Sequence, residues 1–225
     1  VHNRALQASN LGADAILISV PEYIKPPQRD LFRHFNSVAK SFPKIPIIIY
    51  NIPCRTGTEI LPKTVARLAQ ENANIIGIKQ SMGNMERISE MKILCPPDFQ
   101  IYSGDDSLTL PMMALGATGV ISVTSHLEGR LIQDMIEKFK TGNPNEATQI
   151  HQLLYPLIRT LFMTTNPIPV KEALYQRGII KSPVLRTLSR MGRADQGKFV
   201  KELKRFNDQK KAYMLSHKNY SRERS

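Results

Sequence analysis

Lys79 closes a short apolar segment, a place where a charged side chain has no obvious structural use. It follows Ile75-Ile76-Gly77-Ile78, which predicts a buried strand of a parallel sheet. The two-residue period puts Ile75, Gly77 and Lys79 on one face, at the carboxyl end where parallel α/β proteins bind ligands. An amine among apolar groups has a lowered pKa and can attack a carbonyl. The alternative is a lysine that extends from the strand end into water.

Other reactive side chains come at the ends of neighbouring predicted strands. Tyr23 follows the first predicted strand, and Tyr50 ends the second. Arg55 comes five residues after Tyr50, and Gly104-Asp105-Asp106 follows the fourth predicted strand. Each has an ordinary interpretation alone: a packed tyrosine, a solvated arginine and a turn. Placed together on one rim, they would combine a nucleophile, a phenolic acid/base and an anion binder.

Helix and strand patterns alternate through the first half of the chain. Strands recur at roughly 25-residue spacing, which favours a parallel α/β sheet, either open or part of a (β/α)8 barrel. The pattern does not distinguish these two architectures. Strands are predicted at 15–20, 46–50, 75–80, 99–103 and 119–123, and helices at 5–11, 29–41, 61–70, 84–94 and 107–115.

After residue 127 the strand signals stop. Apolar positions at helical spacing predict helices at 130–140, 146–162 and 169–177. Beyond residue 178 the composition turns basic and polar, and the end from about residue 207 is predicted to be a frayed helix or disordered.

Composition narrows the possible partners. The net charge of +12 is concentrated in residues 181–225, which hold 13 Lys and Arg against 4 Asp and Glu, so the body is nearly neutral and no nucleic-acid partner is predicted. Cys54 and Cys95 are the only cysteines, which indicates a reducing, cytoplasmic setting. The five histidines lack metal-ligand spacing, so no metal site is predicted. The apolar runs have strand length, so no membrane partner is predicted.

Five motifs in order resemble the dihydrodipicolinate synthase family of pyruvate-dependent aldolases, which also includes N-acetylneuraminate lyase. The resemblance runs from about residue 1 to residue 206. The motifs are YNIPCRTG at 50–57, IIGIK at 75–79, SGDD at 103–106, GVISVT at 119–124 and NPIPVK at 166–171.

The resemblance implies a (β/α)8 TIM barrel followed by a C-terminal helical domain, with only strands four to eight of the barrel in this chain. Residues 1–127 would form the partial barrel, 128–206 the last barrel helix and the helical domain, and 207–225 a basic polar tail. The family's first three strands, with a Gly-Thr-Thr-Gly-Glu loop that binds the pyruvate carboxylate, have no counterpart here.

Three residues fall on catalytic positions of the family. Lys79 falls on the lysine that forms a Schiff base with pyruvate, so no cofactor beyond this covalent imine is implied. Tyr50 falls on the tyrosine that relays protons to the intermediate. Tyr23 falls on the tyrosine that reaches across a tight dimer interface into the neighbouring site.

Four further residues fall on substrate-binding positions. Arg55 falls on the arginine that holds the carboxylate of aspartate semialdehyde, and Thr56 follows it in the same motif. Gly104 and Ile121 fall on positions that line the pyruvate pocket, largely through backbone. Glu22 and Gln80 depart from the family pattern, which has a second tyrosine and an acidic residue there.

By this resemblance the protein would condense pyruvate with aspartate semialdehyde to 4-hydroxy-tetrahydrodipicolinate in lysine biosynthesis, as a cytoplasmic homotetramer of tight dimers. One alternative is an N-acetylneuraminate or sugar-acid lyase of the same family, against which Arg55 argues. The other is a non-catalytic truncated barrel whose basic tail binds a partner such as nucleic acid.

Overall fold

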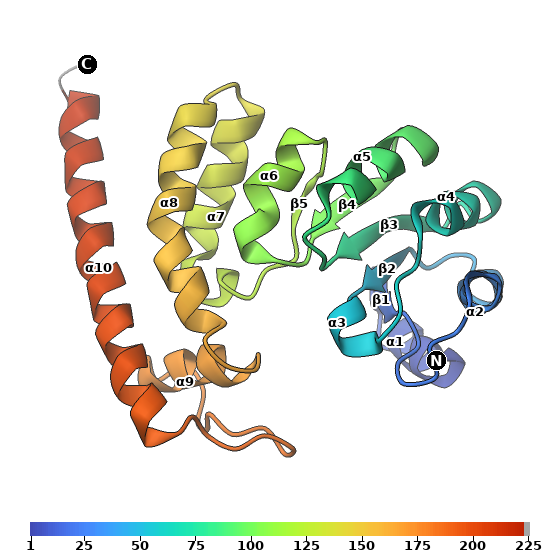
Figure 1. Ribbon diagram of the computed structural model, residues 1–225, viewed down its shortest axis with the longest axis horizontal. Coiled ribbons are helices and arrows are strands. Elements are labelled where there is room, and N and C mark those ends of the chain that lie inside the picture. Colours follow the sequence, from blue (N-terminus) through green and yellow to red (C-terminus); the bar gives the residue numbers. More distant parts are fainter. Residues whose placement is uncertain (223–225) are drawn as a thin grey trace. The chain divides into compact units, whose positions relative to one another are not determined.

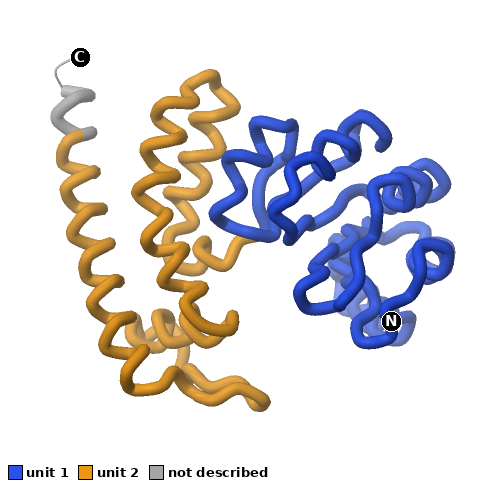
Figure 2. Tube along the Cα trace, in the orientation of Figure 1, with its two compact units in different colours: residues 1–121 blue, residues 122–225 orange. Residues whose placement is uncertain are grey.

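The computed structural model describes residues 1–222, with side chains for residues 1–216 (Figure 1). The chain forms two compact units, residues 1–121 and 122–225 (Figure 2). The division predicted from the sequence, at residues 127 and 206, stays a prediction. Within residues 1–222, no helix combines the length and the apolar character that crossing a membrane requires.

The first unit contains a five-stranded parallel sheet in which the strands are neighbours in chain order. The strands are β1 (Ile16–Ser19), β2 (Ile47–Asn51), β3 (Ile75–Gln80), β4 (Gln100–Ser103) and β5 (Gly119–Val120). The helices are α1 (His2–Asn10), α2 (Gln28–Ser41), α3 (Pro53–Thr56), α4 (Pro62–Glu71), α5 (Met85–Leu94), η1 (Asp106–Leu108) and α6 (Thr109–Ala114).

The apolar side chains of this sheet are buried on one of its two faces only. Ile47 and Ile49 of β2 are buried in a core shared with α2, α4 and α5, whereas Ile48 and Tyr50 on the opposite face are half-exposed and Leu17 of β1 is 44% exposed. An open doubly wound sheet carries helices on both faces and reverses its strand order at a switch point. Sequential strands with helices on one face are instead the winding of a barrel wall.

The alternation predicted for β3 is wrong at its start. Ile47 pairs with Ile75, but Ile48 pairs with Gly77, so the register shifts at Ile76. This irregularity turns Ile75 into the helix-facing core, away from the face that holds Lys79. Gly77 is required there, because a Cβ would lie 2.6 Å from the carbonyl oxygen of Gln100.

Local signals explain where several helices begin and end. Pro62 occupies the first turn of α4, and the side chain of Asn84 caps α5 by accepting a hydrogen bond from the Glu86 amide at 3.0 Å. The short helix α3 was not predicted; it ends at Gly57, whose φ of 76° is easily adopted only by glycine. The strand predicted at 119–123 is shorter in the structure, where β5 comprises only two residues.

The second unit is helical. It contains α7 (Ser125–Lys140), α8 (Pro144–Leu161), α9 (Ile168–Gln176) and α10 (Arg193–Arg222). Of the two alternatives for the end from residue 207, a frayed helix or disorder, the structure shows a helix as far as residue 222, because α10 is continuous. Phe199 and Phe206, seven residues apart on one helix face, are both buried and anchor it. Residues 223–225 lie outside the described part.

Two buried carboxylates hold long-range ion pairs in this unit. Glu128 pairs with Arg177 at 3.3 Å and with Lys210 of α10 at 2.5 Å. Glu172 accepts two hydrogen bonds from Arg190, at 2.8 and 3.0 Å, and these bonds hold the pKa of Glu172 below its usual value despite burial. These pairs join segments that are 18 to 82 residues apart in sequence.

Candidate active site

Strand register places Lys79 between two tyrosines. Lys79 of β3 is paired with Tyr50 of β2 and with Tyr102 of β4. The three side chains are half-buried on the sheet face away from the helices, and the Lys79 Nζ lies 4.4 Å from the centroid of the Tyr50 ring. Sequence reasoning missed Tyr102, although it is the penultimate residue of β4, two residues before Gly104, just as Tyr50 is the penultimate residue of β2.

The surroundings of Lys79 favour a neutral amine. Burial lowers the pKa of Lys79, and the nearby charge of Arg55 lowers it further, while Asp106 and Asp105 act in the opposite direction. The net shift is downward. A larger share of the amine is therefore unprotonated near neutral pH than for an exposed lysine, which is what a nucleophile requires.

Gly104 allows the chain after β4 to pass close to the lysine. Its amide donates to the carbonyl of Gln80 at 2.8 Å. A Cβ at this position would lie 1.9 Å from Ser81 Oγ and 3.1 Å from Lys79 Cε. The space beside the lysine stem therefore depends on the absence of a side chain at residue 104.

Gly104→Ala is expected to displace Ser81 and the end of the Lys79 side chain, and so to slow covalent trapping of a carbonyl ligand on Lys79 by roughly tenfold or more. The measurement is the rate of pyruvate trapping by borohydride. Combining Gly104→Ala with Ser81→Ala removes the closest atom and should restore part of the rate. An unchanged rate in the single variant would contradict the assignment of Gly104 to the pocket.

An acidic turn lies next to the lysine. Ser103 Oγ donates to the carbonyl of Asp105 at 2.7 Å, and Thr109 Oγ1 donates to that of Asp106 at 2.9 Å, so the turn after β4 is fixed by side chains. Burial and the neighbouring Asp106 raise the pKa of Asp105, whereas Lys79 lowers it. The sequence interpretation of these acids as a turn is confirmed, but their electrostatic contact with Lys79 was not foreseen.

Ile121 reaches the same rim through its backbone. Its amide donates to the carbonyl of Ser103 at 3.0 Å, directly beside the Gly104 turn, and its side chain is half-buried. The position suits a residue that contacts a ligand by backbone atoms. Its role in substrate binding stays a prediction.

Arg55 lies on the exposed turn formed by α3. The Gly57 amide donates to the carbonyl of Pro53 at 2.8 Å and closes the turn. Thr56 is buried, and its hydroxyl lies 2.9 Å from the carbonyl of Thr58 and 3.1 Å from that of Ile52, so it stabilises the turn. A direct contact between Thr56 and substrate stays a prediction, whereas the Arg55 side chain is within electrostatic range of Lys79.

Tyr23 is placed differently from the other candidates. Its side chain is 92% exposed, and its φ of 73° lies in the left-handed region that non-glycine residues rarely adopt. Lys25 shares this feature with a φ of 45°, and its side chain passes over Gly57, so the two loops touch. The structure therefore brings together Lys79, Tyr50 and Gly104, while a catalytic role for Tyr23 stays a prediction.

Among residues 1–216, whose side chains the structure describes, no group of three or more His, Cys, Asp or Glu side chains is arranged to hold a metal ion.

The fold and site are those of an α/β protein whose parallel sheet holds a half-buried lysine with a lowered pKa near the carboxyl ends of its strands. The Dihydrodipicolinate synthetase family matches residues 3–205. The chain belongs to this family.

Named relatives are similar over most of the chain. A 4-hydroxy-tetrahydrodipicolinate synthase of Acaryochloris marina is 54% identical over 172 residues, which is 76% of this chain and 58% of that protein. The enzyme of the same name from Desulforudis audaxviator is 51% identical over 176 residues, or 78% of this chain and 59% of that protein. The chain thus spans less than two thirds of the length of these relatives.

Solved structures show the same architecture. Dihydrodipicolinate synthase from Aquifex aeolicus superposes with a TM-score of 0.88 at 43% identity, covering 92% of this chain and 72% of that one. The enzyme from Cyanidioschyzon merolae, solved with lysine bound, superposes with a TM-score of 0.88 at 38% identity. The match covers 91% of this chain and 69% of that chain. The α/β fold with a parallel sheet is therefore that of the barrel proteins of this family.

Proposed function

We propose that this chain carries the reactive lysine of an enzyme that condenses pyruvate with aspartate semialdehyde to 4-hydroxy-tetrahydrodipicolinate. The observation that carries the proposal is the Lys79 amine, with a pKa lowered by burial and its Nζ 4.4 Å from the centre of the Tyr50 ring. The names of the relatives support the choice of reaction.

In the proposed mechanism the neutral Lys79 amine attacks the ketone carbon of pyruvate and water leaves, which gives an imine. The imine withdraws electrons, so the pyruvate methyl loses a proton, relayed by Tyr50, to form an enamine. The enamine carbon attacks the aldehyde carbon, and the new alkoxide takes up a proton. The amino group of the second substrate then displaces Lys79 from the imine, which closes the ring and frees the enzyme.

Arg55 is the proposed selector of the second substrate. Its guanidinium offers two parallel charge-assisted hydrogen bonds to a carboxylate, and its charge is close enough to affect the pKa of Lys79. A short aldehyde bearing a carboxylate can therefore place its carbonyl near the enamine. A neutral sugar aldehyde, as in an N-acetylneuraminate or sugar-acid lyase, would offer this guanidinium no carboxylate to bind.

The proposal extends to the arrangement of the whole protein. The five strands would be strands four to eight of the barrel, with three strands and the carboxylate-binding loop for pyruvate contributed by sequence outside this chain. Ile121 and Gly104 would line the pyruvate pocket, with Thr56 beside Arg55. Exposed Tyr23 would enter the site of a second copy in a cytoplasmic homotetramer built from tight dimers.

Borohydride reduction tests the proposal directly. The full-length protein is incubated with pyruvate, reduced and mapped by mass spectrometry, and we expect a reduced pyruvyl adduct on Lys79. Turnover is then compared with aspartate semialdehyde and with N-acetylmannosamine as the second substrate. An adduct elsewhere would refute the role of Lys79, and better turnover with the sugar would assign the protein to another branch of the aldolases.

A further inference from the structure

The loop that carries Arg55 is closed at its base by a buried pair of amides. Asn51 Oδ1 accepts a hydrogen bond from the Ile60 amide at 3.2 Å, and Asn51 Nδ2 donates to Gln80 Oε1 at 2.9 Å. Both side chains are only 1% exposed. Asn51 and Gln80 directly follow Tyr50 and Lys79, so the same two strand ends carry the reactive side chains on one face and this pair on the other.

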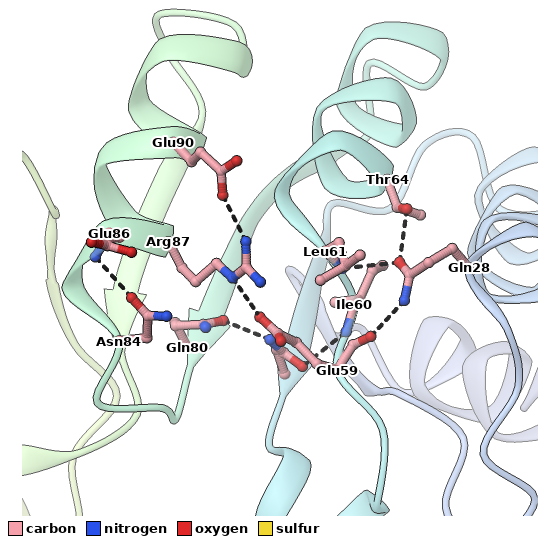
Figure 3. A network of polar contacts seen from close by, with 11 residues as sticks. Gln28, Glu59, Ile60, Leu61, Thr64, Gln80, Asn84, Glu86, Arg87 and Glu90 are labelled. Carbon is pink, nitrogen blue, oxygen red and sulfur yellow. Dashed lines mark hydrogen bonds and ion pairs between the residues drawn. The ribbon is translucent and has the colours of Figure 1, made fainter.

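A second contact reaches the base of the loop from α2. Gln28 Nε2 donates to the carbonyl of Glu59 at 2.7 Å, while Gln28 Oε1 accepts from the Leu61 amide at 3.0 Å and from Thr64 Oγ1 at 2.8 Å (Figure 3). One side chain thus holds the backbone on both sides of Ile60. It connects segments 31 to 36 residues apart in sequence.

A third contact comes from α5. Arg87 Nε lies 3.2 Å from Glu59 Oε1, and Arg87 Nη1 donates to Glu90 Oε2 at 2.9 Å (Figure 3). The Arg87 and Glu59 side chains are 31% and 23% exposed, so the ion pair is partly shielded from water. Residues 59–61 are therefore held by side chains from α2, β2 and α5.

We propose that four residues fix the loop of residues 52–61: Gln28, Asn51, Gln80 and Arg87. They are positioning residues, because a fixed loop holds Arg55 where it can bind the carboxylate of the second substrate. This inference rests on the proposed function. The turn at 53–57 is closed by its own hydrogen bonds, so it moves as a body when its base moves. The four residues affect the affinity for the acidic aldehyde. Imine formation between Lys79 and pyruvate depends on them less.

Gln28→Ala is the informative variant, because it removes two hydrogen bonds to the backbone of the loop base and one to Thr64 of α4 without opening the strand core. We expect the KM for aspartate semialdehyde to rise roughly tenfold, while kcat changes less and pyruvate trapping on Lys79 is retained. Limited trypsin digestion gives a readout independent of turnover. Cleavage after exposed Arg55 should become several times faster, since a looser base lets the turn enter the protease.

Gln70→Ala is the matched control. Gln70 also donates from its side chain to the backbone of a neighbouring element, the carbonyl of Leu94 at 3.2 Å, but this bond does not touch the Arg55 loop. Gln28→Glu keeps the acceptor for Leu61 and Thr64 and loses the donor to Glu59, so its KM should fall between those of the unmodified protein and Gln28→Ala. Gln70→Ala loses a hydrogen bond of the same kind, so an effect of general destabilisation would raise its KM as well.

Two results would overturn the inference: an unchanged KM and cleavage rate in Gln28→Ala, or equal changes in Gln70→Ala. Failure of the proposed function gives a different pattern, in which the unmodified protein traps no pyruvate on Lys79. In that case faster cleavage after Arg55 in Gln28→Ala alone would still support the role of Gln28 in holding the loop.

Discussion

Lys79→Arg is expected to abolish the trapping of pyruvate by borohydride and to lower turnover by at least roughly three orders of magnitude. A guanidinium stays protonated in proteins and cannot form the imine, although it keeps the positive charge between Tyr50 and Tyr102. The measurement is the fraction of protein that carries the reduced adduct. Lys63→Arg, on the exposed side of α4, is the control and should trap pyruvate normally.

The pH dependence of trapping gives a second test of this residue. Burial and Arg55 lower the pKa of Lys79, so the neutral amine is present at lower pH than for an ordinary lysine. The trapping rate should rise with pH through this lowered pKa and level off above it. A rate that rises only in the range of an exposed lysine, or a residual adduct in Lys79→Arg, would contradict the nucleophile assignment.

Arg55→Ala is expected to raise the KM for aspartate semialdehyde strongly, while pyruvate trapping on Lys79 survives. Loss of charge-assisted hydrogen bonds to a carboxylate costs about 1.5 to 3 kcal/mol, which corresponds to roughly a ten- to hundredfold effect. Arg55→Lys keeps the charge without the two parallel bonds, so its KM should be intermediate. Steady-state kinetics with each substrate varied separately measures the effect.

The same substitution has a second expected consequence. Since the charge of Arg55 lowers the pKa of Lys79, its removal should shift the pH profile of trapping upward. Arg67→Ala is the matched control, because Arg67 stacks on Phe32 at 4.0 Å and pairs with Glu71 on the outer side of α4. An unchanged KM in Arg55→Ala would remove the reason for choosing an acidic second substrate.

The strands that position the site could be predicted because each is a short apolar segment bounded by polar residues. The juxtaposition of Tyr50 and Lys79 followed from their places at the ends of two parallel strands. The turn of Ile75 into the core could not be foreseen, because the register shift depends on pairing with β2 and leaves no mark in a local pattern. Tyr102 required knowledge of its partner strand in the same way.

Two other features depend on contacts between distant residues. Helix α10 is mostly polar, so its composition indicated a frayed end, yet buried Phe199 and Phe206 and the pair of Lys210 with Glu128 stabilise it. The contact between Gln28 and Glu59 spans 31 residues. A glutamine at the start of a helix gives no sequence signal that it binds a loop so far away, because the same side chain is equally stable when exposed to water.

The closed base between Asn51 and Ile60 makes the loop a separable module in evolution. Its ends are held by groups outside residues 53–58, so changes within that segment leave the strand ends and Lys79 where they are. Under the proposed function, a lineage could therefore replace the side chain that would meet the second substrate without rebuilding the part of the site that would form the imine. A preference for a different second substrate would then arise by exchange of one short surface segment. The reaction of Lys79 with the first substrate would be conserved.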